Sequence, residues 1–123
     1  MQEHIRHHRD LDVWKEAINL VEDVYKLTRD FPSEEKFGLV SQLRRAAASV
    51  PANIAEGAGR SGANEFVRFL YIAQGSITEL ETHLIISERL GFGPVEAVRG
   101  VEEKRGLVAR LLYGLIRSLN NKR

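Results

Sequence analysis

Residues 11–31, LDVWKEAINLVEDVYKLTRDF, carry the pattern that decides the fold. Their apolar side chains return at alternating steps of three and four residues, which is the period of an α-helix. One row consists of Leu11, Trp14, Ile18, Val21, Tyr25 and Thr28, and a neighbouring row consists of Val13, Ala17, Leu20, Val24, Leu27 and Phe31. Two adjacent rows form a face wider than a single partner helix covers. We therefore expect this helix to lie inside a bundle and to face another subunit as well.

A second helix is expected to begin at Ser33, after Phe31-Pro32 ends the first. The serine hydroxyl and the acids that follow it suit the free amides and the positive dipole end of a helix start. Apolar residues then recur at bundle spacing, at Val40, Leu43, Ala47, Val50 and Ile54. Pro51 interrupts this run, and because proline lacks an amide hydrogen, the sequence predicts a kink near Ala47 within one continuous helix.

Glycines at residues 57–62 separate the second helix from a third, which runs to Leu90. The apolar positions of the third helix are Phe66, Phe69 or Leu70, Ala73, Ile77, Leu80 and Leu84. Gly91-Phe92-Gly93-Pro94 then ends this helix and starts a fourth, with proline in the first turn, where a missing amide matters least. The fourth helix repeats the spacing at Val98, Val101, Val108, Leu112, Leu115 and Leu119, with Arg105 as the polar exception.

These patterns predict an all-α protein, an antiparallel up-down-up-down four-helix bundle with short connections. The length of 123 residues fits one domain with a single core, so residues 1–123 are assigned to one bundle domain. Residues 1–10 form a polar N-terminal segment outside the helical pattern. Residues 120–123 form a polar tail that we expect to be flexible.

Composition narrows the possible function classes. The chain has 18 basic and 17 acidic residues, a net charge of +1, so any surface for nucleic acid must be local. It has no cysteine, which removes disulfides and thiolate chemistry and is compatible with a reducing cytoplasm. No segment has the pattern of a secretion signal or the length of a membrane span. We therefore expect a cytoplasmic protein without a membrane partner.

Two motifs resemble a cofactor-binding or metal-binding motif, but the surrounding sequence favours a structural explanation for each. Gly57-Ala58-Gly59-Arg60-Ser61-Gly62 matches the glycine pattern of dinucleotide sites, but a helix precedes it where a strand is needed, so a turn between helices is favoured. His4, His7 and His8 resemble a metal-binding cluster, yet a mobile polar terminus explains them more simply. We predict no enzyme activity, no cofactor, no metal site and no small-molecule substrate.

Basic residues gather around the second helix and its following turn. Arg44 and Arg45 interrupt the apolar row of the helix, and Arg60 and Arg68 lie near the turn. Such a group predicts a local basic patch. A patch of this kind is what phosphate binding requires, although solvated helix surfaces show it as well.

The fourth helix adds a second basic region. From Pro94 to Arg123, seven basic residues stand against three acidic ones, a local excess of +4 that includes Arg105 and Arg110. Self-association would repeat this surface around a symmetry axis and strengthen its field.

Asn53 and Glu56 are polar residues near the end of an otherwise apolar helix, and Gly57 follows them. A hydrogen bond between the two side chains that fixes packing is favoured over catalysis. The reason is that no nucleophile with an adjacent base accompanies them.

Several short motifs occur together in one order. They are Leu11, Trp14-x-x-Ala17, Phe31-Pro32-x-x-Glu35, Gly38-Leu39, Gln42-x-Arg44-Arg45-Ala46, Ser49, Asn53-Ile54-Ala55-Glu56-Gly57, Arg60, Glu65-Phe66, Phe69-Leu70, Ala73 and Gly75-Ser76. In this combination residues 10–92 resemble the four-helix-bundle proteins encoded in intervening sequences of bacterial 23S ribosomal RNA genes. The resemblance implies a cytoplasmic homo-oligomer, a homopentamer, without enzymatic activity. It also implies similarity to accessory proteins of diversity-generating retroelements, which handle nucleic acid through a basic surface.

The resemblance makes Arg44, Arg45 and Arg60 candidate nucleic-acid contacts, and charge and position add Arg68, Arg105 and Arg110. It assigns a structural role to Asn53, Glu56 and Gly57. Two functions follow as hypotheses. The first is a non-catalytic homo-oligomer that binds RNA or DNA through a basic surface, and the second is a scaffold that acts only through protein contacts.

Overall fold

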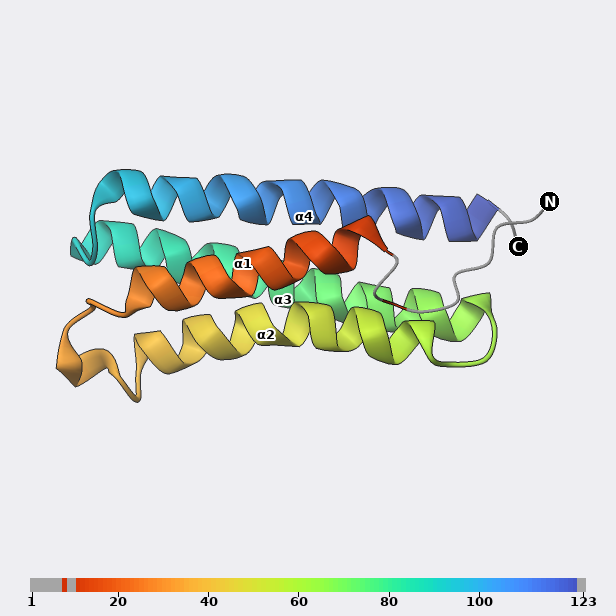
Figure 1. Cartoon of the computed structure of the whole chain (residues 1–123), viewed down its shortest axis with the longest axis horizontal. Coiled ribbons are helices and arrows are strands. Elements are labelled where there is room, and N and C mark those ends of the chain that lie inside the picture. Colours follow the sequence, from red (N-terminus) through yellow and green to blue (C-terminus); the bar gives the residue numbers. More distant parts are fainter. Residues whose placement is uncertain (1–7, 9–10, 122–123) are drawn as a thin grey trace.

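The computed structural model describes residue 8 and residues 11–121, which form a bundle of long α-helices (Figure 1). The elements are α1 (Asp12–Thr28), the short 3-10 helix η2 (Ser33–Glu35), α2 (Leu39–Ala58), α3 (Ala63–Leu90) and α4 (Val95–Asn121). Successive long helices run in opposite directions, and the described residues contain no strand. The predicted all-α, up-down-up-down bundle is confirmed.

Each long helix packs against two others, so the four form a closed ring around one core. The helix α1 contacts α2 and α4, and α3 contacts the same two helices from the other side. The most extensive contact joins α2 and α3. Leucine, isoleucine and valine fill the interior, and the largest fully buried side chains include Leu20, Leu43, Ile54, Leu70, Ile77, Leu80, Leu84 and Leu112. Burial of each such side chain contributes about 1.5–3 kcal/mol.

The two apolar rows of α1 have different environments. The row from Val13 to Phe31 is buried in the core. In the other row Leu11, Trp14 and Val21 are partly buried against that core, and Tyr25 remains 43 % exposed. Most of the wide face of α1 is therefore covered within the chain. The exposed large apolar side chains gather mainly on α3, namely Tyr71, Ile72, Ile85, Ile86 and Leu90.

The start of α2 differs from the prediction. Ser33 begins η2, and α2 begins only at Leu39. The carboxylate of Glu35 accepts a hydrogen bond of 3.0 Å from the Leu39 amide, which is one of the free donors of the helix start. A Cβ at Gly38 would lie 2.9 Å from that carboxylate oxygen, so glycine leaves room for the cap. A glutamate four residues before the helix thus takes the role expected of Ser33.

The α2 helix continues through Pro51 from Leu39 to Ala58, as predicted for one unbroken helix. The kink near Ala47 stays a prediction. At the other end of the chain, Asn120 and Asn121 belong to α4, so the helix extends into the predicted tail, and residues 122–123 lie outside the described part.

The predicted stop after α3 is confirmed at Gly91. Its φ of 76° is a left-handed conformation that glycine adopts without a steric penalty. The Phe92 amide then donates to the Ser87 carbonyl at 3.0 Å, and the Phe92 ring packs on Phe31 with 5.6 Å between ring centres. This contact closes the end of the bundle at which α1 and α3 finish. Across the described residues, none of the helices combines the length and hydropathy that a bilayer crossing requires.

Candidate nucleic-acid interface

Three contacts hold the Arg44 guanidinium between α2 and α1, and the weakest is a hydrogen bond of 3.5 Å from Nη2 to the Tyr25 carbonyl. The Arg44 Nε donates a hydrogen bond of 2.9 Å to Thr28 Oγ1, and the guanidinium carbon lies 4.3 Å from the centre of the Tyr25 ring. The Thr28 hydroxyl donates in turn to the Val24 carbonyl at 2.8 Å, which leaves its oxygen free to accept from Arg44. Within residues 8 and 11–121, Arg44 forms no ion pair with a carboxylate. Its charge is therefore fixed in place and not neutralised.

Arg45 extends in a different direction, toward α3. One of its terminal nitrogens lies 3.4 Å from Glu79 Oε2, and 63 % of the Arg45 side chain is exposed. His83 Nε2 lies 3.3 Å from the same oxygen. An exposed pair of this kind contributes only about 0–1 kcal/mol, so it breaks readily when another anion competes. The structure thus separates Arg44 and Arg45, which the sequence places side by side.

Arg60 and Arg68 both lie against the Phe69 ring, beside the turn between α2 and α3. Their guanidinium carbons lie 5.0 Å and 4.6 Å from the ring centre. Arg60 pairs with Glu56 at 2.8 Å, and Arg68 pairs with Glu65 at 3.4 Å. We call these five residues the Phe69 cluster. The sequence predicted the two arginines, but the helical period left Phe69 and Leu70 as alternatives for one core position and did not indicate that the ring joins them.

Gly57 is what allows the Phe69 cluster to form against α2. A Cβ at this position would lie 2.8 Å from Phe69 Cβ and 3.1 Å from the Phe66 carbonyl oxygen, both too close. The predicted hydrogen bond between Asn53 and Glu56 is wrong, because Asn53 donates to the Ser49 carbonyl at 2.8 Å and Glu56 accepts from Arg60. These residues therefore shape the turn through separate contacts.

Arg105 is not a surface residue, which corrects its prediction as a contact. Its residue exposure is 9 %, and its guanidinium makes two hydrogen bonds of 2.7 Å to the Glu102 carboxylate. Glu81 of α3 lies 3.5 Å from the same group. The Glu102 hydrogen bonds raise the pKa of Arg105 above its ordinary value, in spite of the opposing effect of burial. Arg105 joins α4 to α3, and because two carboxylates neutralise its guanidinium, it is not available to bind a ligand.

Two more basic residues of α4 are neutralised by neighbouring helices. Arg99 lies 3.0 Å from Glu88 of α3, and Lys104 Nζ lies 2.9 Å from Glu16 of α1. The hydrogen bond from Lys104 lowers the pKa of Glu16. The positive excess predicted for the fourth helix is thus largely balanced by carboxylates that the fold places against it.

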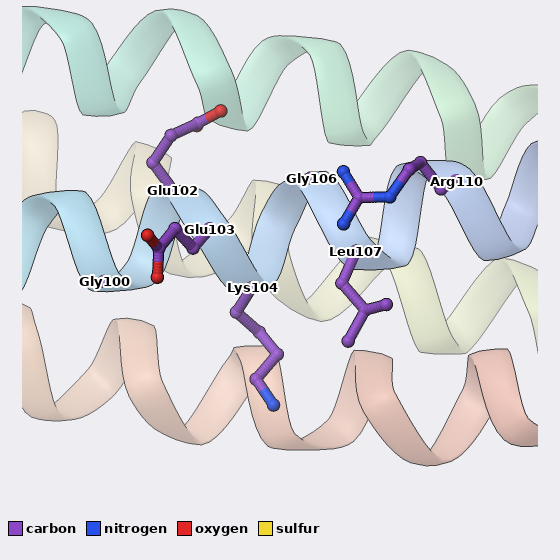
Figure 2. A pocket seen from close by; sticks show the side chains of 7 residues that line it. All are labelled: Gly100, Glu102, Glu103, Lys104, Gly106, Leu107 and Arg110. Atoms are coloured by element: carbon purple, nitrogen blue, oxygen red, sulfur yellow. The ribbon is translucent and has the colours of Figure 1, made fainter.

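Arg110 lies along an open hollow on the outer face of α4 (Figure 2). The hollow has a volume of about 680 Å³, and its lining is Gly100, Glu102, Glu103, Lys104, Gly106, Leu107 and Arg110. Lys104 points toward α1, and Glu103 stands out from the helix on the same stretch as Arg110 (Figure 2). Two carboxylates and two cations line the hollow, so it has no net positive charge and is a poor site for phosphate.

The sequence profile of the 23S rRNA-intervening sequence protein family matches residues 9–114. The chain belongs to this family. A solved structure from the S23 ribosomal protein family of Bacteroides thetaiotaomicron, described as having unknown function, shares the fold with a TM-score of 0.79 and 23 % sequence identity. The similarity covers 85 % of this chain and 95 % of that one. No protein of curated function matches the chain in sequence.

The match to the 23S rRNA-intervening sequence protein family extends further than the motifs indicated. The predicted resemblance ends at residue 92, whereas the profile continues through most of α4. The matched range includes Arg44, the Phe69 cluster and Arg110, and it ends before Arg117.

The three N-terminal histidines lie just outside the family match. His4 and His7 fall outside the described residues. The His8 ring packs edge-on against Trp14, with 5.0 Å between ring centres. In the part of the chain that the structure describes, no group of three or more histidine, cysteine or acidic side chains is placed to hold a metal ion.

Proposed function

We propose that this protein is a non-catalytic, homo-oligomeric, cytoplasmic member of its family that binds RNA or DNA through phosphate contacts. The proposal rests on the environment of Arg44. Its guanidinium is held by Thr28 and Tyr25 and is not neutralised, so it offers a phosphate an oriented charge. Arginine suits this role because its planar fork of donors matches the geometry of phosphate oxygens.

Other basic residues lie on different sides of the bundle, since α4 does not contact α2. Arg45 follows Arg44, donates a hydrogen bond of 2.5 Å to Gln42 Oε1 and has an exposed, weak ion-pair partner in Glu79. Arg110 and Arg117 contribute charge from α4, where neither forms an ion pair with a described carboxylate. The family description refers to an intervening sequence of 23S rRNA and names no ligand, so structured RNA and duplex DNA are tested together.

The test is fluorescence anisotropy of labelled structured RNA and of duplex DNA at two salt concentrations. We expect saturable binding that weakens steeply as salt rises, because bound phosphates release counterions. The variant Arg44→Gln should weaken binding to all sequences alike and reduce the salt slope by about one. Arg99→Gln is the matched control, because Arg99 already pairs with Glu88.

Two outcomes would contradict this assignment. If the wild-type protein binds no nucleic acid at low salt, the proposed function fails. If folded Arg44→Gln binds as tightly as wild type with the same salt slope, binding uses a different surface.

A second candidate function, a scaffold that acts only through protein contacts, is supported by the outer face of α3. Between Arg68 and Arg89 this face presents mainly uncharged side chains, which we call the α3 stripe: Tyr71, Ile72, Gly75, Thr78, Thr82, Ile85 and Ile86. The nearest acid, Glu79, is drawn toward Arg45 and His83. An uncharged, partly apolar stripe about four turns long is suited to pack against a helix of a second copy.

Sedimentation equilibrium tests the α3 stripe as the self-association surface. We expect a single oligomer at micromolar concentration, and a pentamer is the form that the family resemblance implies. Thr82→Glu should dissociate it, because the charge would be buried at the contact. Ser118→Glu, on exposed α4, should not. A wild-type monomer would overturn both the scaffold and the homo-oligomer.

A further inference from the structure

The Phe69 cluster differs from Arg44 in its charge. Two guanidiniums and two carboxylates make up its ionic groups, so it adds little net charge to the surface. Arg60 and Arg68 nevertheless remain well exposed, with 48 % and 57 % of their side chains open to solvent. The cluster therefore presents flat guanidinium groups rather than a positive field.

The construction of the cluster holds these groups against one ring. The Glu56 carboxylate lies 2.8 Å from Arg60, the Glu65 carboxylate lies 3.4 Å from Arg68, and both guanidiniums lie within 5.0 Å of the centre of the ring. Pairing and stacking reduce the conformational freedom that an exposed arginine loses on binding.

We propose that the Phe69 cluster is a stacking site for an unpaired nucleobase. This inference rests on the proposed function and specifies which part of a nucleic acid the protein selects. Unpaired bases stack on arginine planes and on aromatic side chains, whereas bases inside a duplex have both faces covered by neighbours. Arg44 supplies charge for the backbone, and the Phe69 cluster distinguishes a single-stranded loop from a duplex.

The two sites lie on different sides of α2. Arg44 and Arg60 are sixteen residues apart on or just beyond α2, which corresponds to a rise of about 24 Å and a rotation of about 160°. Arg44 faces α1 and the Phe69 cluster lies against α3, so the two sites are separate contacts and are tested separately.

The experiment compares a hairpin RNA that carries 2-aminopurine in its loop with a fully paired duplex of equal phosphate number. The wild type should bind the hairpin about tenfold more tightly and change the 2-aminopurine fluorescence, because stacking quenches it. The double variant Arg60→Lys with Arg68→Lys keeps the positive charges but removes the planar guanidinium groups on which a base would stack. It should lose the preference and the fluorescence change while its salt slope stays the same.

Two further variants complete the test. Phe69→Leu keeps the Cβ against which Gly57 packs and removes the ring, so it should behave like the double lysine variant once circular dichroism shows that it is folded. Arg99→Lys is the matched control and should behave like wild type.

The failures of the two proposals are distinguishable. Salt-dependent binding with equal affinity for hairpin and duplex would overturn the stacking site and leave the proposed function standing. If the double lysine variant still prefers the hairpin, the stacking site is likewise overturned and the proposed function stands. Absence of binding to either RNA would overturn both.

Discussion

At the scale of single residues, Gly57 sets how closely α2 and α3 approach beside the turn. Its missing side chain lets the backbone of α2 rest on Phe69, and Phe69 supports the two arginines above it. A glycine inside a helix ordinarily costs up to about 1 kcal/mol relative to alanine. At this position the close contact outweighs that cost.

Gly57→Ala should therefore destabilise the protein by about 1–3 kcal/mol, because the added methyl group would overlap Phe69 and the Phe66 carbonyl. Urea unfolding followed by circular dichroism measures the change. Gly114→Ala is the control, since a Cβ there meets no atom within 4 Å, and it should stabilise the helix by up to about 1 kcal/mol. Equal stability of Gly57→Ala and wild type would show that α2 and α3 separate easily here.

Arg105 gives a second prediction at this scale. Its stem is buried, while its partners Glu81 and Glu102 keep 44 % and 40 % of their side chains exposed, so they stay solvated without it. Arg105→Met should then remain within about 1 kcal/mol of wild type, and Arg105→Ala should lose about 2–4 kcal/mol through the cavity it leaves. Urea denaturation gives the free energy of unfolding of each variant and tests this difference. If both variants lose the same amount, the ion pair and not the packing holds α4 to α3.

At the scale of elements, the helix interiors were predictable because their apolar period is local. The buried rows of α2 and α3 match the predicted positions, and Arg105 occupies the predicted polar position in the row of α4. The start of α2 was not predictable, because Ser33 is a good cap in isolation and the Glu35 cap depends on the path of the chain at Gly38.

The charges of α4 show why the candidate interface was harder to predict than the helices. The Glu102 partner of Arg105 lies three residues away, but Glu16 and Lys104 are 88 residues apart in the sequence. A count of charges along one helix cannot include a partner from another helix. Only the folded structure shows that Arg44 has no carboxylate partner among the described residues, whereas most basic residues of α4 are paired with a carboxylate.

The contact between α1 and α4 should make stability depend on pH in acid. Because the Lys104 hydrogen bond lowers the pKa of Glu16, this carboxylate stabilises the folded state above its unfolded pKa of about 4.3. The contribution disappears as the pH falls through the lower, folded pKa. In melting curves from pH 2.5 to 7, Glu16→Gln should melt below wild type at neutral pH and converge with it in acid. Glu22→Gln, on the exposed side of α1, is the control. A difference that persists at pH 2.5 would contradict the ionic origin.

At the scale of the whole molecule, contacting helices are neighbours in sequence except for α1 and α4, which close the ring. Bundles with such local contacts fold within microseconds to milliseconds, since little chain entropy is lost before contacts form. Trp14 is the only tryptophan and lies on α1, so its fluorescence reports when α1 joins the bundle.

Stopped-flow refolding should therefore show a dominant Trp14 phase complete within about ten milliseconds, followed by a minor slow phase from proline isomers of the unfolded chain. The double-jump experiment, in which the protein is unfolded only briefly, should remove the slow phase. A dominant phase of seconds that survives the double jump would mean that closing the ring is the difficult step.

The α3 stripe also restricts the symmetry of any assembly that it forms. Arg68 and Arg89 stand at its two ends. If two copies paired stripe to stripe, a parallel arrangement would set each arginine against itself, and an antiparallel arrangement would set Arg68 of one copy against Arg89 of the other. Both place like charges together, but Glu65 pairs with Arg68 and offsets part of the repulsion, so a two-fold dimer is disfavoured only weakly. If the stripe instead meets a different surface of the next copy, the interface either closes into a ring, for which odd numbers are as acceptable as even ones, or continues as a filament.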